Sequence, residues 1–136
     1  IAVANGLSVA MGLPVLGGTS LEAWEVESDS YLVVGDARRG SFFVALVRDR
    51  VLQGEPELVD EAAITGHLAP FLAEGLAVHS PDAKVVEALP GAKLSFPSAV
   101  RLAVRFQTAD FAALSTTPLE PVYLRAPYIT TPKARG

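Results

Sequence analysis

The fold of this chain is decided by one stretch, Tyr31-Leu32-Val33-Val34-Gly35-Asp36-Ala37-Arg38-Arg39-Gly40-Ser41-Phe42-Phe43-Val44-Ala45-Leu46-Val47. Its two ends, residues 31–35 and 41–47, are apolar and rich in β-branched and aromatic residues, with turn residues on their flanks. Five residues separate them, which suits a hairpin connection, and Gly40 can adopt the left-handed conformation that such a turn needs. The stretch therefore predicts two antiparallel, buried strands.

The hairpin is expected to belong to a larger, partly antiparallel sheet. Short apolar runs bounded by turn residues follow and precede it along the chain, and runs of this kind are typical of strands. The additional strands predicted are residues 15–17, 51–53, 58–59, 76–78 and 84–88.

Helices are predicted where a capping residue precedes apolar residues spaced three or four apart. The segments concerned are residues 1–12, a short helix capped by Thr19 or Ser20, residues 61–74 after Asp60 with Gly66 and Pro70 as weak points and Gly75 at the end, and residues 97–114. In the short helix, Leu21 and Trp24 share one face, so Trp24 is expected in the core rather than as a ligand platform. Strands followed by mixed helices and strands predict a three-layer α/β domain.

Composition limits the classes of function. The chain has 136 residues, half of them apolar, which suits one domain with a proper core. Its formal net charge is −4 and its Lys and Arg residues are scattered, so direct binding to nucleic acid is not expected. It has no cysteine, which excludes disulfides and fits a reducing cytosol. No apolar stretch approaches the roughly 20 residues of a membrane span, so a cytoplasmic protein is expected.

Residues that could carry chemistry are few. Asp36 ends a buried strand, where α/β proteins often place a functional carboxylate, but Arg38 and Arg39 occupy the turn where a phosphate-binding loop would carry glycines. A structural role, with Asp36 accepting hydrogen bonds from turn amides, is favoured over nucleotide contact. His67 and His79 are twelve residues apart and lie on different predicted elements, so no metal site is expected. No Gly-x-Ser-x-Gly motif or nucleophile with a base and an acid is visible.

The segment Glu120-Pro121-Val122-Tyr123-Leu124-Arg125 lies near the C-terminus. Pro121 blocks a helix, so the segment should be extended, with Val122 and Leu124 on one face and Tyr123 on the other. We expect it to dock on the domain with the Tyr123 ring buried and Arg125 bound to a carboxylate. A structural tether is favoured over a partner-binding edge. Residues 127–136 form a basic tail that is expected to be flexible.

Two of these motifs together resemble the TsaB family, the glycoprotease-like, non-catalytic subunit in bacterial assembly of the threonylcarbamoyladenosine modification of tRNA. The resemblance covers essentially the whole chain but only the C-terminal half of the family, and residues 50–95 match poorly. It marks nine positions for structural or partner contact: Asp36, Arg38, Arg39, Gly40, Glu120, Pro121, Tyr123, Leu124 and Arg125.

The resemblance implies a ribonuclease-H-like fold of the actin-type ATPase (ASKHA) superfamily, an α/β domain with a mixed sheet flanked by helices. It divides the chain into a helical leading segment left from an N-terminal half (residues 1–28), the C-terminal ribonuclease-H-like domain (29–126) and the tail (127–136). Because the chain opens on Ile1 and not on Met, we expect an N-terminal half to be missing.

The resemblance also implies a function. The chain would be a scaffold that performs no chemistry and holds no cofactor, binds a TsaD-like catalytic subunit together with a TsaE-like ATPase, and meets tRNA only through these partners. Its first helix would contribute to the contact with the catalytic subunit, or would join two copies in a homodimer. The alternative is an enzyme, either an actin-type ATPase half or a glycoprotease-like hydrolase. The arginine-bearing turn, the missing nucleophile motif and the lack of the His-x-x-x-His spacing of the sister catalytic subunit disfavour that alternative.

Overall fold

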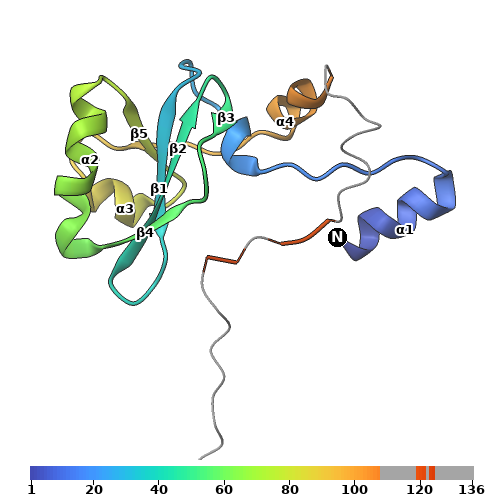
Figure 1. Cartoon of the computed structure of the whole chain (residues 1–136), viewed down its shortest axis with the longest axis horizontal. Coiled ribbons are helices and arrows are strands. Elements are labelled where there is room, and N and C mark those ends of the chain that lie inside the picture. Colours follow the sequence, from blue (N-terminus) through green and yellow to red (C-terminus); the bar gives the residue numbers. More distant parts are fainter. Residues whose placement is uncertain (108–118, 122, 125–136) are drawn as a thin grey trace, which may run out of the picture.

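The computed structural model describes residues 1–107, 119–121, 123 and 124. These residues form a mixed α/β fold in which helices flank a six-stranded sheet (Figure 1). The α-helices are α1 (Ala2–Met11), α2 (Ile64–Ala73), α3 (Ala83–Ala88) and α4 (Ala99–Phe106), and two short 3₁₀ helices are η1 (Ser20–Ala23) and η2 (Glu61–Ala63). The strands are β1 (Tyr31–Asp36), β2 (Ser41–Arg48), β3 (Val51–Leu52), β4 (Glu57–Asp60), β5 (Ala77–Ser80) and β6 (Lys93–Leu94).

The sheet is built around the predicted hairpin. Strands β1 and β2 pair antiparallel from Tyr31 opposite Val47 to Asp36 opposite Phe42, and Gly40 in their turn has φ +70°. The strand order is β3-β2-β1-β5-β6, and β4 pairs with β2 beside β3. Strands β3 and β4 both run antiparallel to β2, whereas β5 and β6 extend the sheet in parallel. The hairpin, the third strand and the extension at residues 58–59 are thus confirmed.

Strand β1 is buried on both faces because it lies between β2 and β5 in the middle of the sheet. Leu32 and Val34 join the core under α2 and α3, while Tyr31 and Val33 join a second core on the opposite face. Fully burying one Leu or Val side chain contributes about 1.5–3 kcal/mol. The alternating apolar side chains of this strand therefore hold both layers together.

The second core is closed by the segment before β1. Trp24 is only 3% exposed, so the predicted core role is confirmed. The hydroxyl oxygen of Thr19 accepts a hydrogen bond from the Leu21 N–H, which confirms Thr19 as the helix cap. Helix η1 packs against α4 (Figure 1). Residues 20–26 thus pack on the same sheet as the rest of the domain, and the division at residue 28 stays a prediction.

Residues 84–88 were predicted as a strand, and this prediction is wrong. They belong to helix α3, whose start is fixed by an Asp82 carboxylate oxygen that accepts a hydrogen bond from the Lys84 N–H at 2.9 Å. The two adjacent valines look like part of a strand, but in the helix Val85 alone enters the core, where it is fully buried. The capping aspartate decides between the two structures.

A strand was also predicted at residues 15–17. This prediction is wrong, because within the described part of the chain these residues pair with no strand. Two glycines, Gly17 at the end of this segment and Gly18 after it, allow close packing. A side chain at Gly17 would meet Leu119, and one at Gly18 would overlap the Phe106 ring of α4. The absence of a Cβ lets this segment cross close to both residues.

The predicted helix after Asp60 is confirmed with changes. It begins as η2 and continues as α2, and it runs unbroken through Gly66 and Pro70 before Gly75, which has φ +85°. The Asp60 side chain caps no amide among the described residues, and it accepts a hydrogen bond from the Ser41 hydroxyl at 3.3 Å. Helix α4 is confirmed from its Ser98 cap to Phe106, whereas its predicted continuation to residue 114 lies outside the described residues, as does the tail at 127–136. Strand β6 was not predicted.

Candidate functional site

The turn between β1 and β2 carries the first group of motif residues. An Asp36 carboxylate oxygen accepts a hydrogen bond from the Arg38 N–H at 2.6 Å, which confirms the predicted contact with a turn amide. Arg38 and Arg39 have φ values of +65° and +57°, in the left-handed region. The Gly40 carbonyl accepts a hydrogen bond from the Glu61 N–H at 3.0 Å, so the turn is also tied to the start of η2.

The backbone conformation of this turn costs free energy, and hydrogen bonds hold the turn in place. Left-handed backbone costs about 1–2 kcal/mol for each residue with a side chain, and the Asp36 bond offsets part of that cost at Arg38. Both arginine side chains are exposed at the tip of the hairpin. The arrangement can present positive charge to a partner, while the Asp36 carboxylate is engaged within its own turn.

The C-terminal motif docks differently from the prediction. The Tyr123 ring is 78% exposed, so its predicted burial is wrong. The contact with the domain is made two residues before the proline: Leu119 lies so close to Gly17 that a Cβ there would come within 2.7 Å of its side chain. Glu120 and Pro121 are exposed and Leu124 is half-buried, whereas Val122 and Arg125 lie outside the described residues.

A polar chain that sequence reasoning missed connects three distant elements. The Trp24 indole N–H donates to the Ser95 Oγ at 2.7 Å, and the same oxygen lies 2.9 Å from the His79 Nδ1. His79, at the end of β5, is buried, and burial together with the positive charge of Lys93 lowers its pKa. Trp24 and Ser95 are 71 residues apart in sequence. The only sequence signal was a histidine inside an apolar run that forms a strand.

The Ser95 and His79 pair is not arranged as a catalytic triad. In a triad, the imidazole takes the serine proton and an acid orients its other nitrogen. Here the serine oxygen is engaged by the indole, and the neighbour of His79 that carries charge is the cation Lys93. The Tyr31 ring meets the imidazole edge-on, with ring centres 6.1 Å apart. The geometry suits a structural link between the leading segment and the sheet.

Arg50 also binds the segment that contains Trp24. It sits in the turn between β2 and β3 and donates hydrogen bonds to the Trp24 and Val26 carbonyls at 2.8 and 2.7 Å. Its Nε donates to Asp29 at 2.8 Å, and its guanidinium lies 5.5 Å from the centre of the Tyr31 ring. The Tyr31 hydroxyl donates to the Leu21 carbonyl, and burial raises the pKa of this phenol. Residues 21–29 are therefore held by one guanidinium and one phenol.

His67 lies on α2, within the helix predicted after Asp60, and its side chain is half-buried. Its Nε2 is 3.7 Å from a Glu57 carboxylate oxygen. Among the described residues, no group of three or more His, Asp or Glu side chains could hold a metal ion.

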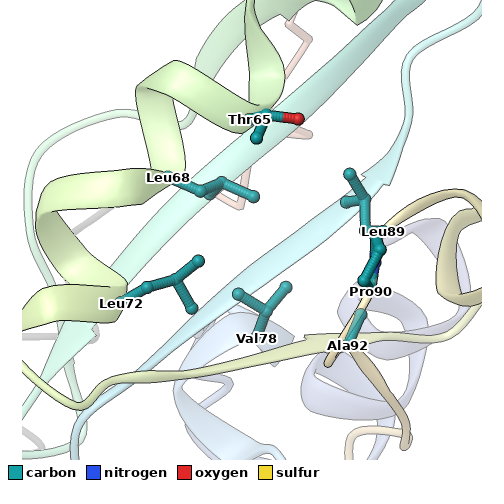
Figure 2. Close-up of a pocket in the computed structure, with 7 residues that line it drawn as sticks. All are labelled: Thr65, Leu68, Leu72, Val78, Leu89, Pro90 and Ala92. Atoms are coloured by element: carbon teal, nitrogen blue, oxygen red, sulfur yellow. The ribbon is translucent and has the colours of Figure 1, made fainter.

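A small apolar pocket opens between α2, β5 and the loop after α3 (Figure 2). Its volume is about 50 Å³, enough for a methyl group or the end of one aliphatic side chain. Figure 2 shows Leu68 and Leu72 facing Leu89 across the opening, with Val78 beneath them. Its walls are Thr65, Leu68, Leu72, Val78, Leu89, Pro90 and Ala92.

Helix α1 stands apart from the sheet (Figure 1), and within the part of the chain that the structure describes none of its residues is buried. Val3 and Val9 are 77% and 86% exposed, and Leu7 and Met11 are exposed as well. Exposed apolar patches of this kind mark interaction sites or aggregation liabilities. No helix among the described residues has the length and apolar character that crossing a membrane requires.

A scan of the chain against models of protein families found no match, and a search of curated proteins found none either.

Proposed function

We propose that this chain is a TsaB-like scaffold that binds a TsaD-like catalytic subunit and, with a TsaE-like ATPase, supports the threonylcarbamoyladenosine modification of tRNA in the cytoplasm. The observation that carries the proposal is helix α1, which is mostly apolar, ten residues long and has no buried residue. A helix that buries nothing in its own domain gains stability when a partner covers it.

The fold supports the same proposal. In the mixed sheet, the antiparallel strands β1 to β4 are followed by β5 and β6, which run parallel to β1, and helices lie on its faces; this agrees with a ribonuclease-H-like domain of the ASKHA superfamily. Fold alone does not establish function, so the family assignment depends on the two motifs, residues 36–40 and 120–125.

The site geometry favours a scaffold over an enzyme. The Asp36 carboxylate is occupied by the amide of its own turn, and arginines stand where nucleotide phosphates would need glycine. Because the chain has a net charge of −4, we expect its partners and not the chain itself to bind tRNA. Arg38 and Arg39 at the tip of the hairpin are candidates for binding acidic groups on such a partner.

Binding to the purified TsaD-like protein of the same organism tests the proposal. We expect a complex by light scattering and calorimetry, and we expect Val3→Glu and Val9→Glu to weaken it at least tenfold, because each places a charge in the apolar surface of α1. Val100→Glu is the matched control, since Val100 is a similarly exposed valine on α4. If no complex forms, or if the control weakens it as much as the α1 variants do, the role assigned to α1 is wrong.

The same samples test for enzymatic activity and self-association. We expect no ATP hydrolysis and no peptidase activity, and we expect α1 to pair two copies of the chain when the catalytic subunit is absent. Turnover that disappears in Asp36→Ala would favour the ATPase or hydrolase instead. A molar mass that stays monomeric at high concentration would rule out the homodimer but not the heteromeric complex.

A further inference from the structure

The direction of the Trp24–Ser95 hydrogen bond is fixed, whereas that of the Ser95–His79 bond depends on the imidazole tautomer. A tryptophan N–H can only donate, so the Ser95 Oγ accepts from Trp24 at 2.7 Å. The serine hydroxyl has one proton, and its second neighbour is the His79 Nδ1 at 2.9 Å. When His79 is neutral with its proton on Nε2, Nδ1 carries a free lone pair and accepts the serine proton.

Protonation of His79 would disturb this chain in two ways. Nδ1 would become a donor, so the serine proton would lose its acceptor in a site that is largely shielded from water. The imidazolium would also be poorly solvated. The groups that face the ring are the Tyr31 ring from β1, Ser95, and Lys93 from β6, a cation that disfavours a second positive charge. Behind the Tyr31 ring lies Arg50, which is paired with Asp29.

We propose that Trp24, Ser95 and His79 form a proton-sensitive latch, which holds residues 20–26 on the sheet while His79 is neutral and loosens them when His79 becomes charged. Two backbone hydrogen bonds close beside the latch, from the Glu25 N–H to the Phe96 carbonyl at 2.9 Å and from the Ser98 N–H to the Ala23 carbonyl at 2.8 Å. These two amides report whether the segment is closed. Arg50 still holds the Trp24 and Val26 carbonyls, so the opening should be local.

The direction of the pH dependence follows from the lowered pKa of His79. The open state, in which the ring meets water, binds a proton more readily than the closed state, whose pKa lies below the ordinary value of about 6.5. The stability of the closed state is therefore fully present above about pH 6.5 and decreases as the pH falls below that value. The equilibrium constant for closing falls by at most about tenfold per pH unit, and it stops falling below the pKa of His79 in the closed state.

Hydrogen exchange followed by NMR between pH 7.5 and 5 tests the latch. We expect the protection factors of the Glu25 and Ser98 amides to be constant above pH 7 and to fall several-fold below pH 6.5. The Ala37 amide, which bonds to Ser41 in the β1–β2 turn, should keep its protection. The fluorescence of Trp24, the single tryptophan of the chain, should change over the same pH range.

Two histidine variants separate the latch from general effects of acid. His79→Gln can still accept from Ser95 but cannot become charged, so its two reporter amides should show no pH dependence; His67→Gln should behave like the wild type. If His79→Gln loses protection below pH 6.5 as the wild type does, the latch is wrong. Should that variant fail to fold, the titration of the His79 ring in the wild type decides. A midpoint shared with the loss of protection supports the latch, and protection that stays constant while the ring titrates overturns it.

Discussion

Replacing Arg50 should destabilise the domain more than any other substitution of a charged residue in the described part of the chain. Arg50→Ala removes two hydrogen bonds from a charged donor to the Trp24 and Val26 carbonyls, each worth about 1.5–3 kcal/mol. It also removes a cation–π contact with Tyr31 worth about 0.5–1 kcal/mol. The ion pair with Asp29, which is largely exposed, adds less than about 1 kcal/mol. Allowing for water that reaches the freed carbonyls, we expect a loss of about 3 to 4 kcal/mol.

Urea unfolding followed by Trp24 fluorescence measures this loss. With a slope of about 1.5 kcal/mol/M, the midpoint should fall by about 2 to 2.7 M. Arg50→Lys keeps the charge but cannot fork to two carbonyls, so it should lose about 1–2 kcal/mol. Arg48→Ala is the matched control, because Arg48 pairs with Glu74 at the surface and its loss should cost less than about 1 kcal/mol. Equal midpoints for Arg50→Ala and Arg48→Ala would refute the reasoning.

Three further substitutions have definite expected outcomes. Gly35→Ala should cost about 1–3 kcal/mol in thermal unfolding, because the new methyl group would overlap the Phe43 ring on β2, whereas Gly66→Ala, with open space around it on α2, should gain about 0.5–1 kcal/mol. Asp36→Ala should cost about 1 kcal/mol and Asp36→Asn much less, since the amide oxygen can still accept from the turn; equal losses would show that the charge matters. Tyr123→Ala should change stability by less than about 0.5 kcal/mol, and a larger loss would mean that the exposed ring is covered in solution.

Local patterns were enough to predict the centre of the sheet. The hairpin, its left-handed Gly40 and the short return strand depend on residues within about twenty positions of one another, where β-rich runs and turn residues act directly. Trp24 was also placed correctly in the core from its spacing to Leu21.

Two of the errors concern short apolar runs, whose structure periodicity alone does not decide. In residues 84–88 the preceding Asp82 cap favoured the helix, whereas residues 15–17 pair with no described strand. The burial of Tyr123 was predicted from alternation alone, although Leu119 takes the contact with Gly17. The link from Trp24 to His79 through Ser95 depends on how distant segments cross, which no local pattern encodes.

The separation between Trp24 and Ser95 has a consequence for synthesis of the chain on the ribosome. The serine that accepts from the indole is made 71 residues after it. At about 5–20 residues per second, the ribosome needs roughly 4 to 14 s to add those residues. During that interval the nascent segment 20–26 has neither Ser95 nor, at first, the Arg50 guanidinium to hold it. Until then the indole N–H has no serine to bind, so the Trp24–Ser95 bond must form late in synthesis.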